Sequence, residues 1–117
     1  MEIITIAPFL DYFEKVRSRT MRLVACIPPD KLEWRCAEGK FTPGDLTRHI
    51  AATERYVFAE SVAGGRNRYS GCGRDLADGY DDVVRFMERM HSESMKIFSQ
   101  LSDDDLKKNA PRPKAHP

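Results

Sequence analysis

The chain lacks several features that would place it in a specialised class of protein. Its 117 residues include three cysteines, an odd number, with no C-x-x-C spacing, which argues against both a disulfide framework and a zinc ribbon. The longest uninterrupted apolar run is LVACI at 23–27, which is far too short to cross a bilayer. These absences favour a single soluble domain in a reducing, cytoplasmic compartment.

An excess of charge of one sign is also missing. The 19 basic and 18 acidic side chains give a net charge of +1, so the composition indicates neither a nucleic-acid partner nor a membrane partner. Arginines do cluster locally, and each cluster is interleaved with polar residues or glycine, which predicts solvated faces rather than a phosphate site. The clusters are Arg17, Arg19 and Arg22, and then Arg66, Arg68 and Arg74.

Alternation of polar and apolar residues, the pattern of a half-buried strand, is absent, and helical spacing replaces it. The first helix is predicted over 8–27, where apolar residues recur every three or four positions and Pro28 and Pro29 end the pattern. Cys26, near the end of this helix, is predicted to pack in the core. In the connector that follows, Leu32 and Trp34 are predicted to cover the end of the core.

A second helix is predicted to begin after Thr42 and to end at Gly64. Thr42 is a suitable N-cap, and Asp45 three residues later completes an arrangement like a capping box. The residues expected on its inward face recur at helical spacing. They are Leu46, His49, Ile50, Thr53, Tyr56 and Val57.

A third helix is predicted after a glycine-rich loop, with Asp78 as its N-cap. Its apolar stripe, with Met87, Met90 and Phe98 as ordinary core residues, extends to Leu101 and precedes a short turn ending at 108. The division expected is a helical domain over 1–108 and a proline-rich extended tail over 109–117. Three helices of about 30 Å each predict an all-α, up-down bundle that lacks a fourth helix.

Four stretches of the chain share an order and spacing with a known family. They are LEWR at 32–35, FTPGDLTRHIAATER at 41–55, a long loop followed by YDDVVRFMERM at 80–90, and LSDDDL at 101–106. In these features the chain resembles the DinB/YfiT-like family of four-helix bundle proteins. The resemblance implies a metal-dependent activity of the transferase, isomerase or hydrolase type.

The resemblance also implies a divalent metal site, zinc or nickel, built from three histidines. His49 matches the histidine of the second helix by position and neighbours. The other two would form a His-x-x-x-His pair on a fourth helix, and the chain ends where that helix would begin. His116 lies in the proline-rich tail without such a partner, so the ligand role is not transferred to it.

The residues themselves leave two interpretations of His49 open, a metal ligand and a core histidine with its hydrogen bonds satisfied. Asp45, one turn earlier, suits either an N-cap or a group that orients the imidazole. His91 is expected to be half-buried at the edge of the bundle. Glu54 and Glu60 are expected to be solvated or paired at the surface. Cys36 and Cys72, in connectors, are candidate reactive thiols only if a base lies near.

The missing helix suggests what the chain does. Three amphipathic helices that could cover a fourth would leave an apolar groove, and exposed apolar surface of that size favours association. We therefore expect a homodimer, with helices of a second copy filling the gap. Two functions stay open: a metal-dependent enzyme whose site is incomplete in this chain, and a non-catalytic bundle whose role is interaction or dimerisation.

Overall fold

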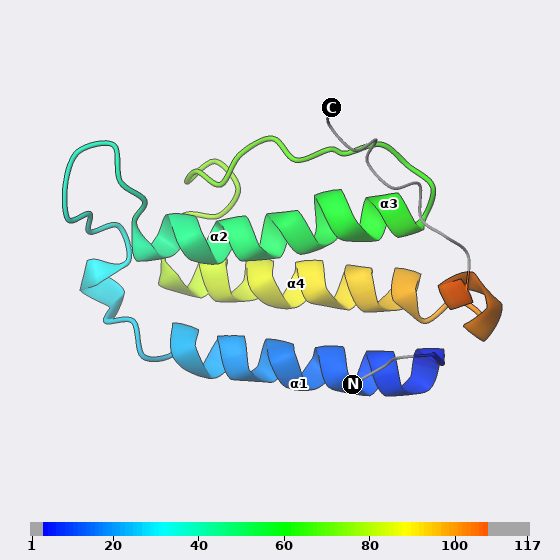
Figure 1. Cartoon of the computed structure of the whole chain (residues 1–117). Helices are drawn as coiled ribbons and strands as arrows, with labels where there is room; N and C mark the ends of the chain where they lie inside the picture. Colours follow the sequence, from blue (N-terminus) through cyan, green and yellow to red (C-terminus); the bar gives the residue numbers. More distant parts are fainter. Residues whose placement is uncertain (1–3, 108–117) are drawn as a thin grey trace, which may run out of the picture.

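The computed structural model describes residues 4–107 and shows three helical rods lying side by side (Figure 1). The first is α1, Ile6–Val24, and the third is α4, Tyr80–Phe98. The second rod is continuous and consists of α2 (Pro43–Thr53), a π-helical segment (Glu54–Ala59) and α3 (Glu60–Val62). No strand occurs between residues 4 and 107, so the all-α prediction is confirmed.

The loop between the second rod and α4 determines the order of the bundle. It runs back along the rod, so that α4 starts at the same end as α2 and runs antiparallel to α1 (Figure 1). Arg68 donates its backbone N–H to the Tyr56 carbonyl at 3.0 Å, which holds the loop against the rod. The 64–79 segment is therefore a crossover connection, and α4 lies between the second rod and α1.

The first helix is displaced from its predicted bounds. It begins at Ile6 and ends at Val24 instead of spanning 8–27. The Ile6 N–H, which has no partner within the helix, donates to Asp103 Oδ1 at 2.8 Å; this contact across the sequence could not be predicted locally. At the other end, Ile27 N–H donates to the Val24 carbonyl, closing a tighter turn before Pro28.

The capping box predicted for the second helix is confirmed. The Asp45 N–H donates to Thr42 Oγ1 at 2.8 Å, and the Thr42 N–H donates to Asp45 Oδ2 at 3.0 Å. The predicted cap of the third helix is wrong. Gly79, at φ 91°, is the N-cap, while the carboxylate of Asp78 pairs with Arg74 at 3.0 Å.

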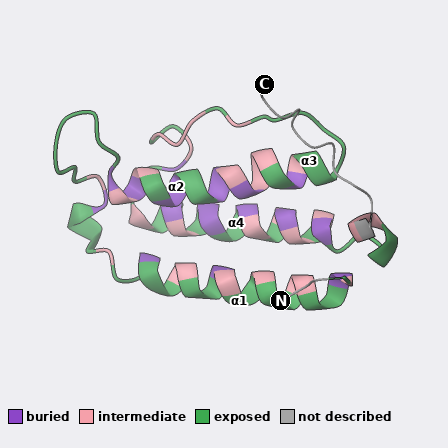
Figure 2. Ribbon diagram, in the orientation of Figure 1, coloured by how far each residue is buried: buried purple, intermediate pink, exposed green. Residues whose placement is uncertain are grey.

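The core lies between α4 and α2. Val83, Met87 and Met90 of α4 form one buried cluster with Ala51 and Ala52, whose small side chains let the helices approach closely. Buried residues lie along both α2 and α4 in Figure 2. The predictions of Leu32, Met87, Met90 and Phe98 as buried residues are confirmed. Those for Trp34 and Cys26 are wrong, because Trp34 is 56% exposed and Cys26 is exposed.

The predicted inward face of the second rod is also wrong for three of its six residues. Leu46, His49 and Ile50 are exposed, and the side that meets α4 carries Thr47, Arg48, Ala51 and Ala52 instead. The larger apolar side chains therefore line a surface that no element between residues 4 and 107 covers.

The remaining predictions concern the end of the chain. The short turn expected after Leu101 exists as a single 3₁₀ segment, Asp103–Lys107. Ser102 N–H donates to Asp105 Oδ2 at 2.8 Å and stabilises its start. The predicted tail at 109–117, with His116, lies outside the described residues. Between residues 4 and 107, no helix has the length and apolar character that a membrane span requires.

Candidate functional site

A groove separates α1 from the second rod, on the side where the larger apolar residues are exposed. Its volume is about 300 Å³. Its lining is mainly apolar, and Ile50 and Phe58 remain 39% and 60% exposed. The complete lining is Phe13 and Arg17 from α1, and His49, Ile50, Thr53, Glu54 and Phe58 from the second rod.

His49 lies at this groove between two aromatic rings. Its Nδ1 is 2.7 Å from the Tyr69 hydroxyl, and the Tyr69 ring meets it edge-on with centroids 5.4 Å apart. Phe41 stacks on the imidazole with centroids 6.4 Å apart. Because the ring is exposed, the interpretation as a satisfied core histidine is wrong. No hydrogen bond to Nε2 occurs within residues 4–107.

The residues around His49 provide one donor for a metal ion. Across residues 4–107, no three His, Cys, Asp or Glu side chains lie close enough together to hold a metal. Asp45 does not orient His49, since its carboxylate caps α2 and pairs with Arg48 at 2.8 Å. The interpretation of Asp45 as a capping residue, the partner of the N-cap Thr42, is therefore the correct one. The described residues alone do not fit a complete zinc or nickel site.

Cys72 reaches His49 through Tyr69. Burial, and after it the neighbouring Cys72 thiol, raises the pKa of Tyr69 above its ordinary value. Tyr69 thus lies between the imidazole and the thiol, so the nearest candidate base contacts Cys72 only indirectly. Cys36 is exposed in the connector.

A charged cluster joins the three rods beside the groove. Glu54 is 3% exposed and pairs with Arg17 of α1 through Oε2. Its other oxygen, Oε1, lies 2.9 Å from Nδ1 of His91 in α4. The second ring nitrogen of His91 bonds to Glu14 of α1. The prediction of a surface role for Glu54 is wrong, because three rods surround it where the π-helical segment begins.

The surroundings of His91 favour its charged form. The residue is half-buried, as the sequence suggested. Burial lowers the pKa of His91, but the hydrogen bonds with Glu54 and Glu14 outweigh burial, so that the pKa lies above the ordinary value. The Phe13 ring stacks on the imidazole at 5.6 Å. Arg17, expected on a solvated face, is buried, and its Nε has no partner within residues 4–107.

A second buried arginine, Arg48, organises the end of the bundle. Its guanidinium binds both oxygens of Glu33, at 2.8 and 2.9 Å, and its Nε donates to the Cys72 carbonyl at 2.7 Å. The hydrogen bond from Arg48 lowers the pKa of Glu33, against the effect of burial. Because Arg48 is fully enclosed by these partners, its role is to hold the connector and the loop to α2.

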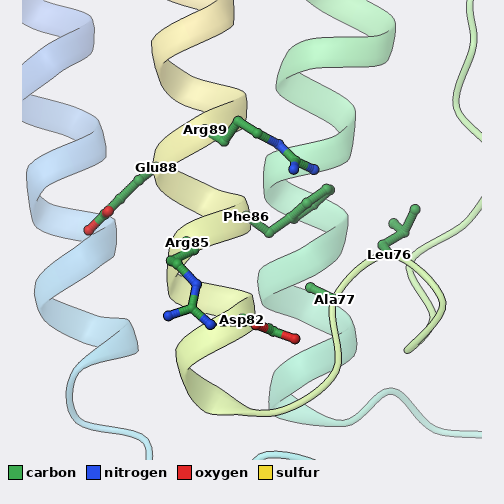
Figure 3. A pocket seen from close by; sticks show the side chains of 7 residues that line it. All are labelled: Leu76, Ala77, Asp82, Arg85, Phe86, Glu88 and Arg89. Atoms are coloured by element: carbon green, nitrogen blue, oxygen red, sulfur yellow. Dashed lines mark hydrogen bonds and ion pairs between the residues drawn. The ribbon is translucent and has the colours of Figure 1, made fainter.

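A larger hollow lies elsewhere, along α4. It measures about 650 Å³ and is lined by Leu76, Ala77, Asp82, Arg85, Phe86, Glu88 and Arg89. Figure 3 shows Glu88 directed toward α1, whereas Phe86 lies toward the second rod. Arg85 pairs with Asp82 at 2.6 Å, and the Arg89 guanidinium lies 5.6 Å from the Phe86 ring centre. Asp82 and Arg85 thus pair with each other, whereas the groove beside α1 has large apolar side chains exposed, so it is the stronger candidate site.

The fold and the groove define the class of the chain: an all-helical bundle protein with one face that residues 4–107 leave uncovered. The sequence model of the DinB superfamily matches residues 12–117, and the chain therefore belongs to that superfamily. Neither the comparison with curated proteins nor the comparison with solved structures gave a match. Membership of this superfamily shows the fold of the chain but not its specific activity.

Proposed function

We propose that this chain is a self-associating helical bundle, in which the groove between α1 and the second rod binds the same surface of a second copy. The observation that carries the proposal is the exposure of Ile50 and Phe58 along a mainly apolar groove. Exposed apolar surface of this kind marks interaction sites in soluble proteins.

The character of the groove favours a second copy as its occupant. A two-fold interface brings the same patch together from both subunits, and here each copy would contribute apolar side chains to cover the other's. Two rods from each copy would then pack as a four-helix arrangement. The net charge of +1 gives little long-range repulsion between copies, and the charged residues that line the groove, Arg17 and Glu54, are paired with each other.

Sedimentation equilibrium of the purified chain at micromolar concentration tests the proposal. We expect a dimer for the natural sequence and a folded monomer for Ile50→Glu, because a charge in the groove would lose hydration on association. Trp34→Glu is the matched control: it also replaces an exposed apolar residue, but one in the connector, which does not line the groove. A folded monomer of the natural sequence contradicts the proposal.

A second candidate function, metal-dependent catalysis of the transferase or hydrolase type, is supported by His49. Some members of the DinB superfamily bind metal. The contact between Tyr69 and Nδ1 leaves Nε2 for a ligand, the arrangement by which neighbouring groups commonly orient metal-binding histidines. A bound divalent ion would supply Lewis-acid chemistry. Two further donors would have to come from a second copy or from residues outside 4–107.

Calorimetric titration of untagged protein with Zn²⁺, and separately with Ni²⁺, tests this candidate. We expect binding that is lost in His49→Gln and retained in His91→Gln, because both nitrogens of His91 already contact carboxylates. Equal binding by the natural chain and His49→Gln would remove His49 from any metal site.

A further inference from the structure

His91 connects α1 to the second rod through both of its ring nitrogens. Nδ1 meets Glu54 at 2.9 Å, and Nε2 meets Glu14, so that each nitrogen contacts a carboxylate from a different element. Glu54 also pairs with Arg17. The side chain of one residue in α4 thereby holds together the two elements that form the walls of the groove.

The two contacts together require a protonated ring. A neutral imidazole has a single N–H and therefore donates to one acceptor, whereas its other nitrogen presents a lone pair. Ionised carboxylates only accept hydrogen bonds, so both contacts are donated only by the imidazolium. Deprotonation of His91 leaves one carboxylate facing a lone pair and breaks one of the two links.

The net charge of the cluster also favours the protonated form of His91. With His91 protonated, the bonded group of two cations and two carboxylates is neutral, and after deprotonation it carries one uncompensated negative charge beside buried Glu54. Other charged groups near His91 lie at the rims of the neighbouring hollows. They are Arg22 of α1, and Glu88 and Lys96 of α4.

Residues of the charged cluster around His91 also line the groove. Arg17 and Glu54 line it, and Phe13, which stacks on His91, forms part of its wall. We propose that protonation of His91 holds α1 in the position that shapes the groove, so that self-association is strong at acidic pH and weakens as His91 loses its proton. This inference rests on the proposed self-association and adds its regulation.

The contacts of His91 with two carboxylates determine in which direction stability changes with pH. A histidine whose pKa is raised on folding contributes stability that is complete below its unfolded pKa and is lost as the pH rises through its folded pKa. The pKa of His91 lies above 6.5. The contacts that hold α1 in place are therefore strongest below that pH and weakest well above it.

Sedimentation equilibrium at a pH about one unit below 6.5, and again about two units above it, measures the effect. We expect the dimer dissociation constant of the natural chain to rise by about fivefold or more between the two, the lower end of common coupling strengths. In His91→Gln, which cannot be charged, the rise disappears. Glu14→Gln, at a half-exposed position, reduces the rise and serves if His91→Gln does not fold.

His49→Gln is the decisive control, because His49 also lines the groove and is a histidine. The pH dependence is expected to persist in that variant. A natural dimer whose dissociation constant does not change with pH, or a change that survives in His91→Gln, overturns the role of His91 and leaves the proposed self-association intact. A monomer at every pH overturns both proposals.

Discussion

Glu33 and Arg48 form a two-point ion pair that links the connector to α2. The guanidinium nitrogens Nη1 and Nη2 lie 2.8 and 2.9 Å from the two carboxylate oxygens. Arg48 is fully buried, and its remaining donors bind Asp45 and the carbonyls of Cys72 and Ala77. One side chain thus fixes three segments at the end of the bundle from which α2 and α4 both begin.

Removal of Arg48 is expected to destabilise the fold strongly. Arg48→Ala leaves two carboxylates and two carbonyls without their buried partner, and we expect the free energy of unfolding to fall by about 3–5 kcal/mol. Urea denaturation of the natural chain and of Arg48→Ala measures this fall. Arg85→Ala, which breaks an exposed pair with Asp82, is the control and should change stability by no more than about 1 kcal/mol. Similar losses in the two variants would contradict the structural role of Arg48.

The ion pair between Glu33 and Arg48 also predicts how the free energy of unfolding changes at acidic pH. The hydrogen bond from Arg48 lowers the pKa of Glu33 below 4.5 in the folded chain. A carboxyl with a lowered folded pKa contributes stability that is present above its unfolded pKa and is lost as the pH falls through the folded value. Glu33→Gln should therefore flatten the loss of stability below about pH 4.5 relative to the natural chain. An unaltered slope in Glu33→Gln would count against this explanation.

The start of α4 offers a test between two neighbouring residues. Gly79 has φ 91°, a region that L side chains adopt at a cost, so Gly79→Ala should lower the free energy of unfolding by about 1–2 kcal/mol. Asp78→Ala removes only an exposed pair with Arg74 and should cost less than about 1 kcal/mol. Thermal unfolding of the two variants compares them. A larger loss for Asp78→Ala would restore Asp78 as the cap.

The sequence predicted those features of the fold whose causes are local. The existence of three long helices follows from apolar spacing, and the Thr42 capping box follows from residues three positions apart. The sequence indicates Asp78 as the N-cap of α4, but the carboxylate of Asp78 is paired with Arg74. The start of α1 was missed because its first N–H finds Asp103, 97 residues away in the chain.

The candidate site was predictable only in part. A groove follows from the packing of three amphipathic helices between residues 4 and 107, but the buried pair beside it does not. Glu54 and Arg17 look like surface residues in the sequence, and only the packing of three rods makes them a buried pair. Arg48 lies directly before His49 in a stretch that resembles the family, yet nothing in its spacing shows that Glu33 would bind it.

Self-association through the groove between α1 and the second rod is the central claim, and an NMR dilution series tests it most directly. Assigned amide signals are followed from the highest attainable concentration down to the monomer. We expect concentration-dependent shifts that concentrate on groove residues from both walls, including Phe13, Ile50 and Phe58. Spectra that do not change with concentration, or shifts confined to the hollow along α4 in Figure 3, would contradict the claim.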